Sequence, residues 1–261
     1  MRLHFLGTGT STGVPQSGCH CAVCCSDDIH DRRFRTSVLW ETAGGSVLID
    51  CGPDFRSQML ALPAGVREQP IRSVLLTHEH YDHVGGLDDL RPYCQYGPIG
   101  IFADKVCAAH LRERMPYCFV ENKYPGVPEV QLHTLTPHEP VTVCGEEIEP
   151  FNVWHGKLPI MAFRQGKRWA YITDMSRLPE EELPQLKGVS LLVINALRIK
   201  PHPTHQSLDE ALSLIERIGP ERAWLIHASH QIGLHAEVSA RLPRNVRLAY
   251  DGLSVQLPEK A

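Results

Sequence analysis

The chain has 261 residues, of which 43% are hydrophobic and 21% charged, as in an ordinary globular protein with ample material for a core. Lys and Arg total 26 against 30 for Asp and Glu, and this net charge of −4 excludes a global electrostatic attraction to nucleic acid. The 15 His and 9 Cys make metal chemistry the first function to consider.

The first half of the chain predicts short strands, followed by two helices. The expected strands are residues 2–6, 37–40, 46–49 and 71–76. Gly44-Gly45 between the second and third strands is a hairpin signal. We expect one helix to begin over residues 85–90 and another to span 104–114, with Asp104 as its N-cap.

Strand patterns dominate the second half of the chain. The expected strands are residues 141–143, 148–153, 160–164, 169–173, 191–195 and 223–226. Residues 207–218 have apolar side chains at helical spacing and end at a Gly-Pro pair, which predicts a helix. A short helix over 234–242 and a closing strand pair over 246–257, around Asp251-Gly252, complete the chain. This order predicts one two-layered or four-layered α/β domain.

The cysteines and the N-terminus both indicate a cytoplasmic protein. The cysteine count is odd, and four of the nine lie close together at Cys19, Cys21, Cys24 and Cys25, unlike a secreted disulfide scaffold. The first apolar stretch is broken by His4 and is too short for a signal-peptide core. No later segment approaches the roughly 18 apolar residues of a membrane span.

The strongest feature is the sequence THEHYDH at residues 77–83, directly after an expected buried strand. Three imidazoles and a carboxylate in so short a segment suit borderline divalent ions such as Zn, Mn or Fe. Residues on one short loop cannot all reach a single ion, so the spacing indicates two ions. The carboxyl end of a strand is also where α/β folds place their sites.

The pattern His-x-His-x-Asp-His after a hydrophobic strand resembles the metallo-β-lactamase-fold hydrolases, and the resemblance extends across almost the whole chain. Further matches to that fold lie at strand ends in the expected order, at Asp50, His155, Asp174 and His227. The resemblance implies a four-layered αββα sandwich, with two mixed sheets flanked by helices. It also implies a single hydrolase domain over residues 1–261.

The same resemblance implies two divalent metal ions at the active site. The N and O ligands leave Zn, Mn and Fe open, with Zn or Mn favoured over Fe. One ion would be held by His78, His80 and His155, and the other by Asp82, His83 and His227. Asp174 would bridge the two ions, and Asp50 would brace the metal-binding loop. In this family, a hydroxide that bridges the metals attacks the substrate.

A second candidate metal site is the motif Cys-x-Cys-x-x-Cys within residues 18–25. A tetrahedral zinc would need a fourth ligand, from His20 or Cys25 nearby or from the distant His230. The motif resembles the PhnP-like cyclic phosphodiesterase branch, in which a His three positions after the last active-site His completes the site. The resemblance therefore implies a structural zinc held by Cys19, Cys21, Cys24 and His230. The alternative is a group of free cytosolic thiols.

His205 is the candidate substrate-binding residue. It lies just before the helix expected at 207–218, where an imidazole can meet an anionic oxygen beside free backbone amides. The phosphodiesterase branch has a His at this place that contacts the phosphate and assists the leaving oxygen, with His202 as the alternative here. The loop over 7–13 lacks the Lys of a nucleotide P-loop and is expected to be a tight turn. The basic run over 31–35 is expected to be solvated or at the substrate edge.

These features together predict a metal-dependent phosphodiesterase that hydrolyses a small linear or cyclic phosphodiester. Asp82 and Asp174 would act as metal ligands, and His205 would protonate or hydrogen-bond the leaving oxygen. We expect a small-molecule phosphodiester substrate and no membrane or nucleic-acid partner, and the sequence leaves a homodimer open.

Two alternatives come from the same fold. A tRNA 3′-processing nuclease, or another hydrolase of the fold, would share the motifs, but the nuclease should carry a long basic arm. A non-catalytic accessory protein of the pyrroloquinoline-quinone pathway would share the cysteine motif, but such proteins depart from the full set of active-site ligands.

Overall fold

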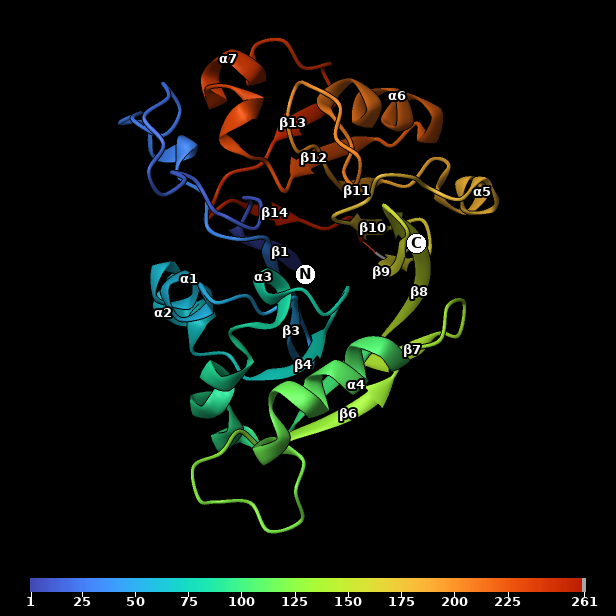
Figure 1. The fold of residues 1–261 in the computed structure, drawn as a ribbon. Coiled ribbons are helices and arrows are strands. Elements are labelled where there is room, and N and C mark those ends of the chain that lie inside the picture. Colours follow the sequence, from blue (N-terminus) through green and yellow to red (C-terminus); the bar gives the residue numbers. More distant parts are fainter. Residues whose placement is uncertain (260–261) are drawn as a thin grey trace.

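Two seven-stranded β-sheets lie face to face in the computed structural model, which describes residues 1–259, and helices cover both outer faces (Figure 1). This is the four-layered αββα sandwich with two mixed sheets, so the predicted fold class is confirmed. Across the described chain the longest α-helix has 11 residues, and the structure contains no helix with the length and hydrophobicity needed to cross a bilayer.

The first sheet is formed mainly by the N-terminal half of the chain. Its strands are β1 (Arg2–Gly7), β2 (Ser37–Thr42), β3 (Gly45–Ile49), β4 (Ile71–Leu75), β5 (Ile99–Ala103), β6 (Val130–Thr134) and β14 (Ser254–Gln256). They lie in the order β14-β1-β2-β3-β4-β5-β6. β2 and β3 form the predicted antiparallel hairpin, and β3 to β6 run parallel to one another.

The second sheet is formed by the C-terminal half. Its strands are β7 (Val141–Val143), β8 (Glu146–His155), β9 (Leu158–Gln165), β10 (Trp169–Ile172), β11 (Leu191–Asn195), β12 (Arg222–Ile226) and β13 (Val246–Leu248). They lie in the order β13-β12-β11-β10-β9-β8-β7. Because β10 to β13 are parallel, their carboxyl ends meet at one edge of the sheet.

Helices connect the strands and cover the sheets. The α-helices are α1 (Phe55–Ala61), α2 (Ala64–Arg67), α3 (Tyr81–Val84), α4 (Lys105–Arg114), α5 (Leu183–Leu186), α6 (Leu208–Ile218) and α7 (His235–Ser239). The 3-10 helices are η1 (Ile29–Asp31), η2 (Leu87–Tyr96), η3 (Pro116–Cys118), η4 (Glu180–Glu182) and η5 (His230–Ile232). Asp104 caps α4 as predicted, and Ser207 caps α6 in a capping box with Glu210.

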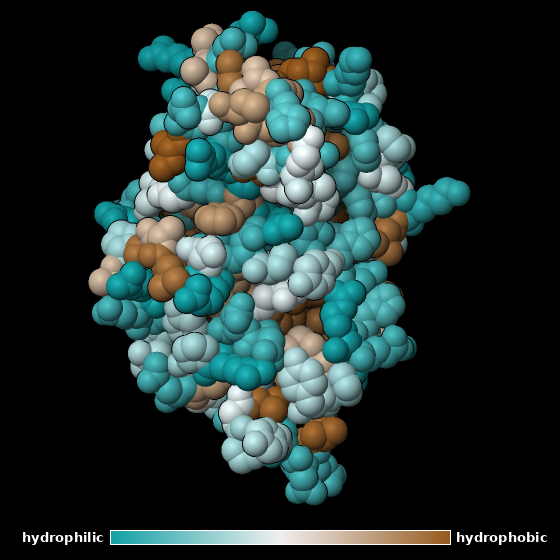
Figure 2. Space-filling view, turned by 60° about the vertical axis from the view of Figure 1, so that its left-hand side comes forward, coloured by the Kyte–Doolittle hydropathy of each residue, from teal (hydrophilic) through white to brown (hydrophobic). Residues whose placement is uncertain are grey.

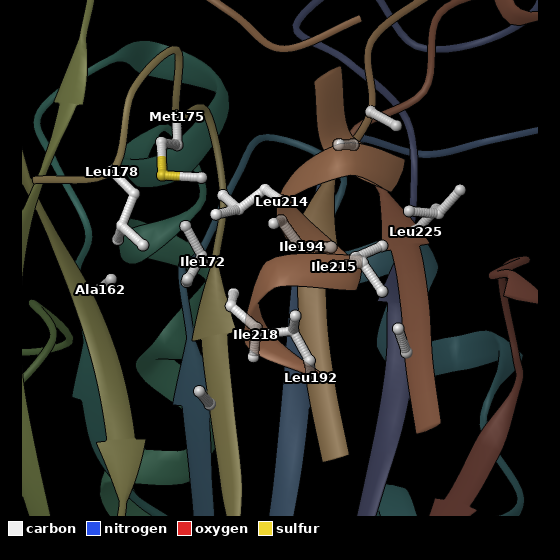
Figure 3. Packing of buried hydrophobic residues seen from close by; sticks show 14 of the residues in the cluster. Ala162, Ile172, Met175, Leu178, Leu192, Ile194, Leu214, Ile215, Ile218 and Leu225 are labelled. Atoms are coloured by element: carbon white, nitrogen blue, oxygen red, sulfur yellow. The ribbon is translucent and has the colours of Figure 1, made fainter. Parts of the chain in front are cut away.

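Three layers of apolar side chains hold the sandwich together. The layer between the sheets contains large buried residues such as Trp40, Phe163 and Tyr171. A second layer packs α6 on the second sheet, where Ile215 and Ile218 point toward the strands (Figure 3). The third layer packs α1 and α4 on the first sheet. On the face drawn in Figure 2, hydrophilic residues prevail and the hydrophobic ones form scattered patches.

Two sequence predictions differ from the structure. The expected helix over 85–90 is the 3-10 helix η2, which contains Pro92, a residue that lacks the amide an α-helix needs. The expected strand pair over 246–257 is not a hairpin, because β13 pairs with β12 whereas β14 pairs with β1 in the other sheet. The Asp251-Gly252 turn therefore carries the chain from one sheet to the other. β5, β6 and α1 were not predicted at all.

Candidate metal centre

The residues predicted to bind the two metal ions meet at one edge of the sandwich, between the two sheets. They follow or end strands β4, β8, β10 and β12, so both sheets contribute. The structure brings together all seven: His78, His80, Asp82, His83, His155, Asp174 and His227. Asp82 and His83 lie on α3 and are buried, whereas His80 is exposed, so the centre is open on that side.

The ligand atoms form overlapping groups, and more than one of these groups contains Asp174. His78, His80 and His155 make one group whose ligand atoms lie within 4.8 Å of one another. Asp174 joins His78 and His83 in a second group, and it joins Asp82 and His227 in a third group of the same dimensions. A carboxylate that belongs to more than one donor group has the position needed to bridge two cations.

The half-buried imidazole of His155 and the fully buried imidazole of His83 are each oriented by a hydrogen bond from the outer nitrogen. His155 Nδ1 donates to the carbonyl oxygens of Asp174 and Thr204, at 2.8 and 2.9 Å. His83 Nδ1 lies 2.7 Å from the Asp50 carboxylate and donates to it. The Nε2 atoms of both rings are left for the centre. Outer partners of this kind are typical of metal-binding histidines.

Two threonines impose the same orientation on the other buried rings. Thr36 donates its only hydroxyl proton to Gly9 O at 2.8 Å. Its oxygen also lies 3.2 Å from His227 Nδ1, so in that second hydrogen bond Thr36 can only accept the Nδ1–H proton. Thr77 donates its proton to the Asp50 carboxylate and accepts from His78 Nδ1–H at 3.0 Å. The lone pair of Nε2 therefore faces the centre in both rings. No sequence motif marks Thr36, because only the fold brings it to His227.

The electrostatics of the site fit divalent cations. His83 is fully buried among Asp50, Asp82 and Asp174, which outweigh the effect of burial and raise its pKa well above the usual range. Its Nε2 lies 3.1 and 3.2 Å from the Asp82 and Asp174 carboxylates, yet it forms no hydrogen bond within residues 1–259. The Asp82 and Asp174 carboxylates that face Nε2 make this an anionic site, which suits a cation.

The other charges at the centre agree with this description. Burial alone would raise the pKa of Asp174, but His227 and His83 hold it well below its usual range. Burial lowers the pKa of His78 and of His227, so both rings are neutral at neutral pH. Ionised carboxylates and neutral imidazoles are the forms that bind metals.

The segment Asp50-Cys51-Gly52 braces the metal-binding loop, as the family resemblance implied. Cys51 N donates to His83 O at 2.7 Å, and Cys51 O accepts from Gly86 N at 2.8 Å. A Cβ atom at Gly52 would lie 2.1 Å from Asp82 O, so this close approach requires glycine. The loop can therefore place Asp82 and His83 directly above the end of β3.

Three site residues have left-handed backbone conformations although none is glycine. Their φ angles are 60° at Asp50, 55° at Asp174 and 57° at His227. Each residue directly follows a strand or lies two positions beyond its end, where the chain turns sharply. Such conformations are unfavourable for L-residues and concentrate at functional sites.

A buried network that the sequence did not reveal holds the loops on which His227 depends. The Asp251 carboxylate accepts from Thr8 N and Thr8 Oγ1 at 2.8 Å, and from Phe34 N at 2.5 Å. Arg33 donates to Thr8 Oγ1 at 2.7 Å and is only 4% exposed. Our expectation that the whole basic run over 31–35 is solvated or at the substrate edge is therefore wrong for Arg33, because its guanidinium satisfies buried oxygens.

The cysteine motif forms a separate donor group with His230. The ligand atoms of this group lie within 4.8 Å of one another, and its members are Cys19, Cys21, Cys24 and His230. Cys21 Sγ and Cys19 Sγ lie 3.2 and 3.3 Å from His230 Nδ1. The hydrogen bond with His230 is the main reason that the pKa of Cys21 is lowered to about 6. Cys25 and His20 do not belong to the group.

These sulfur atoms also accept backbone hydrogen bonds, which stabilise thiolates. Gln16 N donates to Cys24 Sγ at 3.3 Å, and Cys24 N donates to Cys21 Sγ at 3.5 Å. Three sulfurs and one imidazole nitrogen form a closed set that suits tetrahedral zinc. An ion there would tie the N-terminal loop to η5, three residues beyond His227.

His205 lies against the centre, whereas His202 lies behind it. The His205 ring centroid is 4.6 Å from that of His155 and 5.1 Å from that of His227. Its Nδ1 lies 3.8 Å from the Asp174 carboxylate and makes no hydrogen bond in the described chain. Burial lowers the pKa of His205 to about 3, so the ring is neutral at neutral pH. His202 Nδ1 instead accepts from Thr204 N at 3.3 Å.

Comparisons with known proteins agree with this geometry. The beta-lactamase superfamily domain matches residues 46–228. The crystal structure of a diphosphatase from the PhnP family has a TM-score of 0.88 and 37% identity, covering 98% of this chain and 97% of that one. The zinc-bound PqqB of Methylobacterium extorquens has a TM-score of 0.80 and 23% identity, covering 98% of this chain and 100% of that one.

A longer curated relative matches the whole chain. A protein named octanoyltransferase from Porphyromonas gingivalis is 46% identical over 262 aligned residues, which cover 100% of this chain and 52% of that protein. This chain thus spans about half the length of that relative.

Proposed function

We propose that this chain is a phosphodiesterase acting on small linear or cyclic substrates. The proposal proceeds from the fact that the chain belongs to the beta-lactamase superfamily and has the fold of its metal-dependent hydrolases. The observation that carries the proposal is that Asp174 belongs both to the donor group of His78 and His83 and to that of Asp82 and His227. The similarity to a PhnP-family diphosphatase supports phosphorus–oxygen cleavage and extends the substrate class to diphosphates.

The chain's own residues would hold two divalent cations, Zn or Mn. His78, His80 and His155 would hold one cation, Asp82, His83 and His227 the other, and Asp174 both. Bound cations would lower the pKa of a water molecule and offset the charge that develops on the phosphoryl oxygens. The hydrogen bonds from Asp50, Thr77 and Thr36 keep the imidazoles in the required orientation, with no reorganisation during the reaction.

His205 would contact the phosphoryl group or the leaving oxygen. A neutral imidazole can donate one N–H to a developing negative charge. The His205 side chain is 12% exposed, so it can meet a substrate at the surface of the centre while its ring packs on His155 and His227. This places a hydrogen-bond donor beside Asp174, the predicted bridging ligand.

Replacing His205 by Ala should lower kcat on bis(p-nitrophenyl) phosphate by about 100-fold or more, the usual effect of losing a proton donor. His205→Gln retains a neutral N–H donor and should lose less. His202→Ala is the matched control and should have a much smaller effect.

Metal content must be measured in the same His205 variants, because His155, Asp174 and His205 also form a donor group. Full metal content with low kcat supports a substrate contact. A loss of metal that accounts for the loss of activity would instead make His205 a ligand and contradict its proposed role.

The decisive experiment for the proposed function uses wild-type protein reloaded with Mn or Zn. Its substrates are linear and cyclic phosphodiesters, diphosphate diesters and a precursor tRNA. We expect cleavage of small phosphodiesters that depends on the added metal. A fully loaded protein that cleaves none of the small substrates would overturn the proposal. Zinc at the cysteines alone, without turnover, would favour the accessory role.

The protruding loop over residues 116–129 supports a small substrate (Figure 1). A nuclease arm that grips tRNA should be basic, since phosphate contacts require Lys or Arg. This loop contains one basic residue, Lys123, together with Glu121 and Glu129.

The octanoyltransferase name belongs to a chain about twice as long as the matched part, so it gives no support for acyl transfer by this chain.

A further inference from the structure

A cavity of about 200 Å³ lies beside the candidate metal centre. Its walls come from the loops that follow β1, β11 and β12, the last of which begins with His227. Thr10 lines the cavity, and its hydroxyl is only 3.2 Å from His227 Nε2. A single side chain therefore lies between the cavity and the centre, so one small substrate could occupy both.

The cavity is lined by a positive charge that has no acidic partner. The Arg198 guanidinium donates to the carbonyl oxygens of Lys200 and Pro201, at 3.1 and 2.7 Å, and to Gln231 Oε1 at 3.1 Å. Within residues 1–259 it forms no ion pair with a carboxylate. Arg35, which donates to Ser11 O from another side of the same loop, is instead neutralised by Asp54 at 2.7 Å.

The geometry of Arg198 suits an anion. Its three neutral acceptors fix the direction of the guanidinium without cancelling its charge. Arginine is the side chain that best matches phosphoryl oxygens, because its N–H groups form a planar fork.

Two further donor residues line the same cavity. Ser11 and Thr12 are exposed, and in the described structure their main-chain amides donate no hydrogen bond. The Ser11 hydroxyl adds one more donor, whereas the Thr12 hydroxyl donates to Gly13 O at 3.4 Å. Consecutive free amides beside an arginine are a common environment for phosphate.

We propose that Ser11, Thr12, Arg198 and Gln231 form a subsite for a second phosphoryl group, and that the substrate class is therefore the diphosphate diesters. The inference rests on the proposed function, because the reacting phosphoryl group would lie at the metal centre. The Arg198 subsite, as we name these four residues, holds the phosphoryl group that leaves.

The reaction is hydrolysis of the diphosphate bridge. A bond forms between the water oxygen and the reacting phosphorus, and the bond from that phosphorus to the bridging oxygen breaks. The bridging oxygen keeps the electron pair. Two phosphate monoesters result, and each carries one of the two protons of the water. Arg198 offsets the charge that accumulates on the leaving phosphoryl group.

The test compares two substrates that differ by one phosphoryl group, bis(p-nitrophenyl) phosphate and P1,P2-bis(p-nitrophenyl) diphosphate, with products identified by phosphorus NMR. Arg198→Gln should lower kcat/KM for the diphosphate roughly 30-fold, the effect of losing a charged hydrogen bond. It should leave the monophosphate unchanged within about twofold, since only the diphosphate reaches Arg198. Arg198→Lys should restore part of the loss.

The matched control is Arg217→Gln on α6, where the guanidinium is exposed and paired with Glu180. It should change neither substrate. Equal losses on both substrates in Arg198→Gln would show that Arg198 only supports the loop, and no loss on either would exclude the subsite. Both results would overturn the inference while leaving the phosphodiesterase proposal in place.

A binding measurement decides the inference if wild-type protein cleaves neither substrate, which would reject the proposed function. Methylenediphosphonate should bind wild-type protein more tightly than methylphosphonate does, and Arg198→Gln should remove that difference. Equal binding of the two probes by wild-type protein, or a difference that survives Arg198→Gln, would overturn the subsite.

Discussion

Asp174→Ala should abolish hydrolysis of bis(p-nitrophenyl) phosphate, lowering kcat by at least about 1,000-fold, as expected when electrostatic support for the transition state is lost. Asp174 is 2% exposed and belongs to donor groups that also contain His78, His83 and His227. Removing its carboxylate leaves both proposed cations without a shared ligand. It also leaves His83 and His227 without the anion that they face at 3.2 and 3.1 Å.

Metal analysis distinguishes a lost ligand from a misfolded chain. In Asp174→Ala we expect less than the wild-type content of active-site metal, while one zinc remains at the cysteines. Asp209→Ala removes an exposed carboxylate in the first turn of α6 and serves as the control, with wild-type activity and metal content. An Asp174→Ala protein that kept full activity would exclude a bridging role for this residue.

Cys24→Ser should release the zinc at the cysteine motif and lower the melting temperature by about 10 °C or more, because structural zinc binding contributes directly to folding. Cys24 Sγ belongs to the donor group with His230 and accepts a hydrogen bond from Gln16 N. Without the ion, the contacts of Cys19 and Cys21 with His230 at the start of η5 would be only weak S–H and imidazole hydrogen bonds.

Cys25→Ser is a closely matched control, since it changes the adjacent cysteine, which is exposed and outside the donor group. It should keep one equivalent of zinc and the wild-type melting temperature. Unchanged zinc content in Cys24→Ser would mean that these thiols hold no metal. A lower content in both variants would mean that the zinc is bound without a defined site.

The consequences for activity separate the two metal sites. His230 lies three residues after His227, so loss of the cysteine zinc should weaken metal binding at the active site without removing its ligands. Cys24→Ser should therefore recover activity at high Mn or Zn concentration, whereas Asp174→Ala should not. The difference is expected because Cys24→Ser only loosens a loop that supports the active site, whereas Asp174→Ala removes one of its ligands.

Much of the candidate site could be predicted because its residues come in a short motif or at strand ends. Residues 77–83 place four potential ligands on one loop, and apolar runs precede Asp50, Asp174 and His227. Parallel strands bring such positions to one edge of a sheet. The alternation of strands and helices, with the family resemblance, was likewise sufficient for the αββα fold.

Other parts of the fold were beyond sequence patterns. An Asp-Gly pair between two short apolar runs has the form of a hairpin turn, yet Asp251 binds Thr8 and Phe34 and directs the chain into the other sheet. A basic run has the form of a solvated segment, yet Arg33 is buried. In both cases the partners are distant in sequence, so no local pattern records them.

The sequence by itself determined which residues could bind metals, since ligand chemistry resides in the side chain and its spacing in one motif. Only the tertiary structure decided which nitrogen of each imidazole faces the centre. The reason is that each Nδ1 proton is directed by a hydrogen bond to an oxygen that the fold brings beside it. Thr36 accepts from His227, Thr77 accepts from His78, and the Thr204 carbonyl oxygen accepts from His155. Only Thr77 and His78 are neighbours in sequence. The 15 His and 9 Cys indicate metal chemistry, but packing turns three cysteines, seven histidines and two aspartates into two separate donor clusters.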